Sequence, residues 1–176
     1  MKLKGKKLAF LIGPEFEDLE FWVPYMRLME EGADVTVVGI KAGEEYRGKH
    51  GLKARAQIGA DSARAADFEG VVVPGGWAPD KLRRYEGVLR LVRETYQAGK
   101  VVGMICHAGL VGISAGIVEG HTSTGSLGIK DDLINAGATW KDEPAFRSEN
   151  IVWGRVVEDI PDFCRELISA LESKAT

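Results

Sequence analysis

The sequence has little of what marks several specialised classes of protein. It contains only two cysteines, Cys106 and Cys164, and no Cys-x-x-Cys spacing, which argues against a disulfide framework or a zinc ribbon. No stretch approaches the roughly 20 apolar residues that a membrane-spanning helix needs. The net charge is -3 and the lysines and arginines are scattered, so neither a membrane nor a nucleic acid is an expected partner. Free thiols persist in reducing compartments, so we expect a cytoplasmic protein.

Signals for cofactors, metals and export are also missing. The glycine-rich run GGWAPD at 75–80 lacks the Lys-Ser/Thr pair of a phosphate-binding loop, and no cluster of metal-ligating residues is evident. The basic start KLKGKK precedes the apolar run LAFLIG, but that run is only about six residues long and lacks a small-residue cleavage site. We therefore expect no cofactor and no metal, and we interpret LAFLIG as a first strand.

The residues that are present predict a single α/β domain spanning residues 1–176. Hydrophobic residues make up 45% and charged residues 28% of the chain, which is typical of a globular protein. Buried strands are expected at 8–12, 35–40, 71–73, 101–105 and 151–153. Helices are expected around 19–26, 88–96, 111–114 and 129–135 and at the end of the chain, with Pro24 kinking or restarting the first of them and Pro161 in the first turn of the last. Turns and short strands are expected between 41 and 67.

The alternation of strands and helices places three loops at one edge of a parallel sheet. Continuous apolar strands indicate a sheet covered on both faces, and binding sites in such sheets form beyond the carboxyl ends of the strands. One of these loops holds Glu15 and Glu17, the second holds Gly75 and Gly76, and the third holds Cys106. We expect the three loops to meet although they lie far apart in the sequence.

Cys106 is the main candidate for chemistry. It directly follows the strand-like run VVGMI and precedes His107-Ala108-Gly109. A nucleophile at a sharp strand-to-helix turn is lifted clear of the sheet, and the next backbone N–H can hold an oxyanion. The positive end of a following helix would lower the thiol pKa. The alternative is an inert buried cysteine, which is common for this residue type.

Six short segments occur in order along most of the chain: EFEDLE at 15–20, GKHG at 48–51, VPGGWAPDKLR at 73–83, ICH at 105–107, ISAG at 113–116 and GIKDDLINAGA at 128–138. Together they resemble the PfpI-type intracellular proteases, a branch of the superfamily that includes the parkinsonism-associated protein deglycase. The resemblance implies a flavodoxin-like three-layer sandwich with a mainly parallel central sheet. It also implies a homo-oligomer, a dimer and possibly a hexamer.

The resemblance also implies roles for individual residues. Cys106 matches the family nucleophile and His107 the neighbouring histidine, while Asp80 matches an acid that completes the triad across a subunit interface. Glu17 matches the buried acid that hydrogen-bonds the sulfur, and Gly76 and the His107 N–H match the oxyanion hole. From the residues alone, the alternative is that Glu17 and Asp80 are acids at helix N-termini, and a histidine adjacent to the nucleophile does not easily fold back onto it.

Two departures from the family pattern affect the expected site. Many members have Cys-His-Gly-Pro at the turn, whereas this chain has Ala108 and Gly109 after the histidine. Alanine restricts the backbone where glycine would not. In some relatives a tyrosine or histidine lies near the thiol, where this chain has the run TGSL at 124–127. A second acid or base from that loop is therefore not expected.

The first hypothesis for function is a cysteine enzyme that attacks carbonyl groups. Its substrate is either a peptide bond, through an acyl-enzyme, or an α-oxoaldehyde such as methylglyoxal and its protein adducts, with Glu17 shuttling a proton. The alternative is a non-enzymatic stress protein or cysteine-oxidation sensor, since an accessible low-pKa thiol oxidises readily. Glutamine amidotransfer is disfavoured because it needs a late histidine, and none follows His121.

Overall fold

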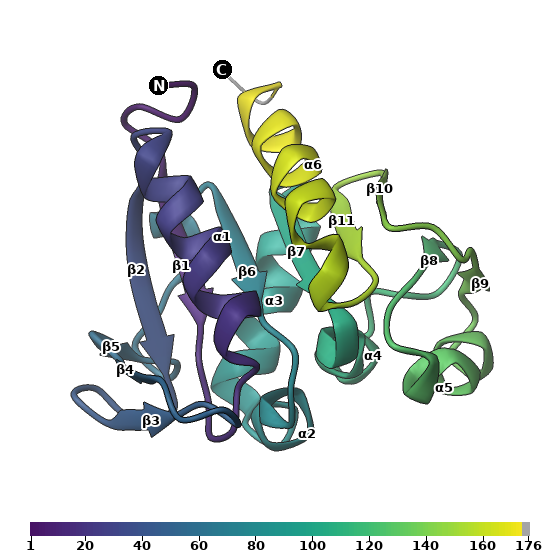
Figure 1. Cartoon of the computed structure of the whole chain (residues 1–176), viewed down its shortest axis with the longest axis horizontal. Coiled ribbons are helices and arrows are strands. Elements are labelled where there is room, and N and C mark those ends of the chain that lie inside the picture. Colours follow the sequence, from purple (N-terminus) through teal and green to yellow (C-terminus); the bar gives the residue numbers. More distant parts are fainter. Residues whose placement is uncertain (174–176) are drawn as a thin grey trace.

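Seven strands form one central sheet in the order β10-β11-β7-β6-β1-β2-β5, with helices on both faces (Figure 1). The computed structural model describes residues 1–173, so residues 174–176 of the expected 1–176 domain lie outside the described residues. The strands of this sheet are β1 (Lys7–Leu11), β2 (Asp34–Gly39), β5 (Ile58–Gly59), β6 (Gly70–Val73), β7 (Val101–Ile105), β10 (Ala145–Ser148) and β11 (Ile151–Gly154). Two small sheets pair β3 (Glu45–Arg47) with β4 (Lys53–Arg55) and β8 (Thr122–Ser123) with β9 (Thr139–Trp140).

Within residues 1–173, six α-helices connect or flank these strands. They are α1 (Asp18–Glu30), α2 (Ala78–Leu82), α3 (Glu86–Gln97), α4 (Gly109–Ala115), α5 (Lys130–Asn135) and α6 (Ile160–Glu172), with single 3-10 turns at Ala65–Asp67, Cys106–Ala108, Leu127–Ile129 and Val157–Asp159. None of the helices within residues 1–173 is long and apolar enough to cross a membrane.

The topology explains which helices cover which face. From β1 the chain moves one way across the sheet to β2, and from β6 it moves the other way to β7. Because crossovers between parallel strands are right-handed, α1 and α3 lie on opposite faces. The helix α6 packs beside α1, and α4 packs beside α3 (Figure 1). This arrangement confirms the predicted flavodoxin-like sandwich. Within the seven-stranded sheet of residues 1–173, β10 alone runs antiparallel to its neighbour.

Burial follows the sequence pattern in the central strands. Every residue of β6 and β7 is buried, as are all but the first of β1, which is expected of a sheet with helices on both faces. Phe10 of β1 packs edge-on against Phe21 of α1 with ring centroids 4.9 Å apart. Contacts of this kind fix α1 over β1 and so fix the loop that joins them.

Two local predictions need correction. The helix α1 continues through Pro24 and does not restart there; its buried residues Phe21, Pro24 and Leu28 anchor it on both sides of the one hydrogen bond that proline cannot donate. The strands β8, β9 and β10 were not predicted, because they are short and carry polar or half-buried residues at the margin of the fold. Short strands in the 41–67 segment were predicted and are present.

Candidate active site

Cys106 lies one residue beyond β7 in a strained turn. Its φ is 61°, a left-handed value that non-glycine residues rarely adopt. The turn runs through the 3-10 segment Cys106–Ala108 into α4, as the sequence predicted. It also allows the adjacent side chain to fold back, because His107 Nδ1 lies 3.3 Å from the Cys106 sulfur. The histidine therefore reaches the thiol.

Two backbone N–H groups point at the sulfur. The N–H groups of Gly76 and His107 both hydrogen-bond Cys106 and lower the pKa of its thiol. Gly76 has a φ of 76°, and a Cβ there would collide with the backbone at Glu17. Gly76 also pairs with Phe16 in an isolated antiparallel bridge, which joins the loops after β1 and β6. The two N–H groups predicted as an oxyanion hole thus meet at one place; that role remains a prediction.

The acid beside the sulfur is Glu20, and the prediction of Glu17 was wrong. Glu17 caps the N-terminus of α1, where its Oε2 accepts hydrogen bonds of 2.9 Å from the N–H groups of Leu19 and Glu20. One helical turn later, the fully buried Glu20 carboxyl hydrogen-bonds the Cys106 thiol. Its Oε1 accepts from Gly75 N–H at 3.0 Å, and Oε2 has no nitrogen or oxygen partner among the described residues.

Gly75 makes this contact possible. A Cβ at Gly75 would collide with Glu20 Oε1 and would lie 2.7 Å from the Cβ of Cys106. Since real side chains do not tolerate such distances, any residue larger than glycine would separate the acid from the sulfur. The glycine pair in the loop after β6 therefore serves two purposes: Gly75 leaves room for Glu20, and Gly76 presents its N–H.

Burial dominates the electrostatics of the pair. Desolvation and then the charge of Glu17 raise the pKa of Glu20 to about 8, although hydrogen bonds from Cys106 and Gly75 lower it in part. Desolvation and then Glu20 raise the pKa of Cys106 to about 12, against the two backbone N–H groups. The sequence had predicted a lowered thiol pKa. That prediction was wrong for the isolated chain because the sulfur is deeply desolvated.

His107 is neutral at neutral pH, and within residues 1–173 Asp80 makes no hydrogen bond or ion pair with it. Burial and then the charge of Lys49 lower the pKa of His107. Its Nε2 has no hydrogen-bond partner among residues 1–173. Asp80 is more than half exposed and pairs with Arg84 at 2.6 Å. Both His107 and Asp80 line a cavity of about 520 Å³ next to the thiol, so Asp80 stands near the site while the predicted triad is not formed in a single chain.

The thiol opens into a smaller pocket of about 200 Å³. Its wall includes the exposed side chain of Trp77, whose ring lies 5.5 Å from the His107 ring. The Nζ of Lys49 lies 5.4 Å from the centroid of the same indole. The pocket is lined by Glu17, Glu20, Lys49, Gly76, Trp77, Cys106, His107, Val156, Val157 and Glu158. It has room for a small carbonyl compound beside a thiol, a carboxyl group and two N–H donors.

Comparison with known proteins assigns this arrangement to a family. The sequence matches the DJ-1/PfpI family over residues 6–170. The chain belongs to this family. It is 38% identical to a deglycase of Pyrococcus horikoshii over 166 residues, covering 94% of this chain and 99% of that protein. It is 36% identical over 168 residues to the Bacillus subtilis protein named "Putative cysteine protease YraA", covering 96% and 99%.

Solved structures agree with the family assignment. A two-domain protein of Anabaena variabilis, with DJ-1/ThiJ/PfpI-like and ferritin-like domains, superposes with a TM-score of 0.93 at 36% identity. The match covers 97% of this chain and 52% of that protein. Drosophila melanogaster DJ-1beta has a TM-score of 0.88 at 24% identity, covering 96% of this chain and 91% of its own, which supports the fold alone.

The departures from the DJ-1/PfpI motif leave the turn intact. Ala108 has a φ of -58° and a ψ of -25°, a helical conformation that alanine adopts as easily as glycine does. Gly109 is the position with little room, because a Cβ there would lie 3.1 to 3.3 Å from Ile129, Leu133 and Trp153. The TGSL loop donates a 3.2 Å hydrogen bond from Ser126 N–H to the Cys106 carbonyl. That loop supports the backbone of the nucleophile.

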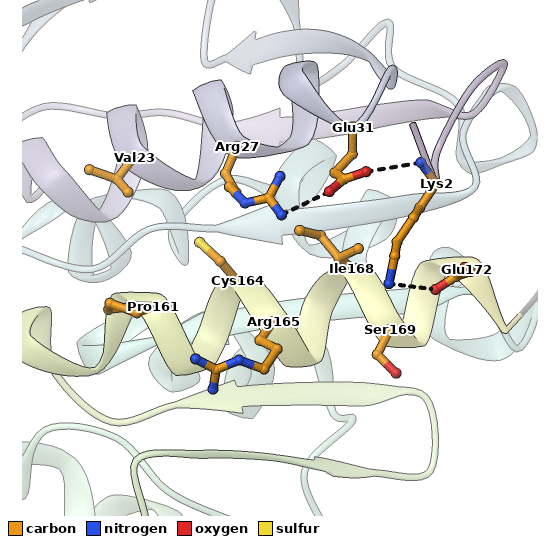
Figure 2. Close-up of a pocket in the computed structure, with 10 residues that line it drawn as sticks. All are labelled: Lys2, Val23, Arg27, Glu31, Pro161, Cys164, Arg165, Ile168, Ser169 and Glu172. Atoms are coloured by element: carbon orange, nitrogen blue, oxygen red, sulfur yellow. Dashed lines mark hydrogen bonds and ion pairs between the residues drawn. The ribbon is translucent and has the colours of Figure 1, made fainter.

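A larger groove, of about 650 Å³, lies between α1 and α6 on the face of the sheet that these helices cover (Figure 2). Its charged groups pair with one another: Arg27 with Glu31 at 2.8 Å, and Lys2 with Glu172 at 3.4 Å. The sulfur of Cys164 lines it, but burial raises the pKa of that thiol to about 11. Among residues 1–173 the groove offers no unpaired acid or base beside its thiol, so the candidate site is the Cys106 pocket.

The sequence analysis missed Glu20, Lys49 and Trp77 as site residues. Glu20 had a signal: it shares the buried face of α1 with Pro24 and Leu28, four and eight residues later, so a carboxyl group stands where helical periodicity expects an apolar side chain. Lys49 lies on a turn, and no local pattern links it to Cys106. Trp77 directly follows Gly76, and its place in the sequence does not show that its side chain borders the thiol.

Proposed function

We propose that this chain is a cysteine-dependent enzyme that converts small α-oxoaldehydes, such as methylglyoxal, or the adducts that they form on proteins. The observation that carries the proposal is the Glu20–Cys106 pair: a buried carboxyl group with a pKa of about 8 hydrogen-bonded to a nucleophile on a strained turn. A pKa near the working pH suits a group that must both take and return a proton. The deglycase name of the Pyrococcus horikoshii relative agrees with this reaction.

The first step is addition of the thiol to the aldehyde carbon. The sulfur forms a bond to that carbon, and the thiol proton passes to the aldehyde oxygen, which gives a hemithioacetal. The N–H groups of Gly76 and His107 hydrogen-bond the sulfur, which supports the proposal that they hold the oxygen as negative charge develops on it. The small pocket suits a compact aldehyde better than an extended peptide.

The second step moves a proton between neighbouring carbons. The ionised form of Glu20, which is the minor form at neutral pH because of the raised pKa, removes the proton from the carbon bonded to sulfur, and the electron pair forms an enediolate. Glu20 then returns the proton to the former ketone carbon, and the hydroxyl proton on the first carbon moves to the oxygen on the second. The first carbon is thereby oxidised to a thioester and the second is reduced to an alcohol, so no external oxidant is needed. Water cleaves the thioester, which releases lactate and restores the Cys106 thiol.

We propose further that the enzyme works as a homo-oligomer, in which Asp80 of a second copy orients His107. The unpartnered Nε2 of His107 and the open cavity that it shares with Asp80 support this. Two free cysteines fit a reducing setting, the cytoplasm. Size-exclusion chromatography with light scattering gives the number of copies, and a monomer that is fully active would rule out a cross-subunit triad.

The test of the reaction is incubation of the purified protein with methylglyoxal. We expect lactate to form, and we expect Cys106→Ala to form none. Absence of lactate from the folded wild-type oligomer would overturn the proposal. Cleavage of a fluorogenic peptide that depends on Cys106, in the absence of lactate, would assign peptidase chemistry instead. A sulfinic acid on Cys106 after mild peroxide, with neither reaction, would assign an oxidation sensor.

A further inference from the structure

The charged side chains of the Cys106 pocket do not cancel. Five ionisable groups besides the thiol line it: Glu17, Glu20, Lys49, His107 and Glu158. At neutral pH Glu20 is protonated and His107 is neutral, because burial raises the pKa of the first and lowers that of the second. Two carboxylates and one ammonium remain, so the wall of the pocket carries one net negative charge.

Of the two carboxylates, Glu158 is the one available to a ligand. Glu17 is already engaged by the N-terminus of α1, and its Oε1 lies 3.7 Å from His50. Glu158 is exposed on the 3-10 turn Val157–Asp159 and makes no hydrogen bond or ion pair with any residue of the described chain, 1–173. The neighbouring cation, Arg155, is held by Asp142 and Asp159 at 2.8 to 3.3 Å.

The mouth of the pocket already accommodates a cation. The Lys49 ammonium lies over the Trp77 ring at 5.4 Å, and this lysine has no carboxylate partner among the described ion pairs. An aromatic face attracts positive charge, and Trp77 borders the thiol pocket and both adjoining cavities. A positive group that enters beside the thiol therefore meets an aromatic face and an unpaired carboxylate.

We propose that Glu158 is a specificity-determining residue of the Cys106 pocket, one that favours carbonyl compounds carrying a positive group close to the reacting carbon. Adducts on ammonium or guanidinium side chains belong to this class, whereas methylglyoxal is neutral. The substrate part of this inference rests on the proposed function. The charge preference of the pocket does not depend on the proposed function, since it follows from the side chains that surround the thiol.

Charged thiol reagents measure the preference without turnover. Methanethiosulfonates form a disulfide with Cys106 and release methanesulfinate; one reagent carries an ethylammonium group and another an ethylsulfonate group. The ratio of their rate constants, with modification of Cys106 followed by peptide mass, is compared with the ratio for a small free thiol. We expect wild type to favour the cationic reagent over that reference. Glu158→Gln should lower the ratio about threefold and Lys49→Gln should raise it.

The matched control is Glu69→Gln, which changes the net charge equally at an exposed position just before β6, at the other end of the sheet. Equal ratios in Glu158→Gln, Glu69→Gln and wild type would overturn the proposal. A lowered ratio in Glu158→Gln alone, shrinking as salt is added, supports it. This result holds even if methylglyoxal is not converted, so failure of the reaction and failure of the charge preference are separate outcomes.

Turnover then tests the substrate part. Glu158→Gln should raise the KM for a peptide carrying a cationic arginine adduct of methylglyoxal about threefold and leave the KM for free methylglyoxal unchanged. An equal change for both substrates would mean that Glu158 acts on the pocket in general, and it would overturn the assigned specificity.

Discussion

The two cysteines of this protein occupy the two contrasting cavities of the fold. Cys164 lines the larger groove, in the middle of the regular helix α6, among charges that are paired with one another. Cys106 lines a pocket less than a third as large, on a turn with a positive φ, beside a buried carboxyl oxygen that has no nitrogen or oxygen partner. Both thiols have raised pKa values because both are desolvated.

Neither the cavity volume nor the thiol pKa therefore singles out the candidate site. Cys106 differs from Cys164 in that its surroundings destabilise the fold. Its backbone has a strained φ, and the buried Glu20 carboxyl group lies beside it; both cost free energy. The fold tolerates these unfavourable features around Cys106, whereas the charged groups in the groove around Cys164 are paired. Unsatisfied groups that converge on a nucleophile are therefore the better indicator.

Replacing each cysteine in turn by alanine tests this comparison most strongly. Cys106→Ala should lower the rate of methylglyoxal conversion by at least about 10³-fold, since the covalent step is lost. Cys164→Ala should leave the rate within about twofold of wild type. Initial rates of lactate formation, at matched fractions of folded protein by circular dichroism, check both. Comparable losses in the two variants would remove the distinction drawn between the cavities.

Glu20→Gln tests the acid separately from the thiol. Glutamine keeps an oxygen for the Gly75 N–H but cannot take and return a proton. We expect a loss of about 10²-fold in kcat, while iodoacetamide still alkylates Cys106. Glu17→Gln, one turn earlier, is the matched control and should retain most of the kcat. Equal losses in the two variants would show that the assignment of Glu20 is mistaken.

The raised pKa of Glu20 also predicts how stability depends on pH. The folded state keeps this proton up to about pH 8, whereas the unfolded chain loses it near the ordinary value of 4.5. Protonation thus stabilises the fold fully below pH 4.5, and this contribution is lost as the pH rises toward 8. Glu20 contributes a slope of about -1.4 kcal/mol per pH unit over this range. Urea unfolding from pH 5 to 8 should show a flatter profile for Glu20→Gln; identical profiles would contradict the buried, protonated carboxyl.

The smallest expected effect is that of the helix cap. Glu17→Ala removes the acceptor for the Leu19 and Glu20 N–H groups and should lower the free energy of unfolding by about 1 kcal/mol. Glu17→Gln keeps an acceptor and should cost less. Denaturant midpoints compare the two variants. A loss of activity without loss of stability in Glu17→Ala would show that Glu17 takes part in the reaction and is not only a helix cap.

The sequence predicted the layers, the central strands and the turn at Cys106 because long apolar runs, glycines and short loops specify them locally. The sequence could not decide whether Glu17 or Glu20 contacts the sulfur. EFEDLE holds four carboxylates within about one helical turn, and only the residue at which α1 begins decides which of them caps the helix and which faces the sheet.

The remaining errors have the same origin, in that they depend on three-dimensional surroundings. The thiol pKa depends on how deeply the sulfur is buried. That burial is a property of the folded chain and cannot be read from the position of Cys106 before a helix. Lys49, Trp77 and Glu158 come from three separate loops, and only the completed fold brings them around one pocket. The proposed contact between Asp80 and His107 would require a second copy of the chain, so neither the sequence nor the single fold could supply it.

The hydrogen bond between Glu20 and Gly75 spans 55 positions of the chain, and Cys106 joins the pair from still further along. These contacts cannot form early in folding, when only segments close in sequence have paired, because β1, β6 and β7 must first align. A newly made or partly unfolded chain therefore carries an ordinary cysteine. The surroundings of Cys106 are acquired at the end of folding, so the environment of this thiol reports whether assembly of the sheet is complete.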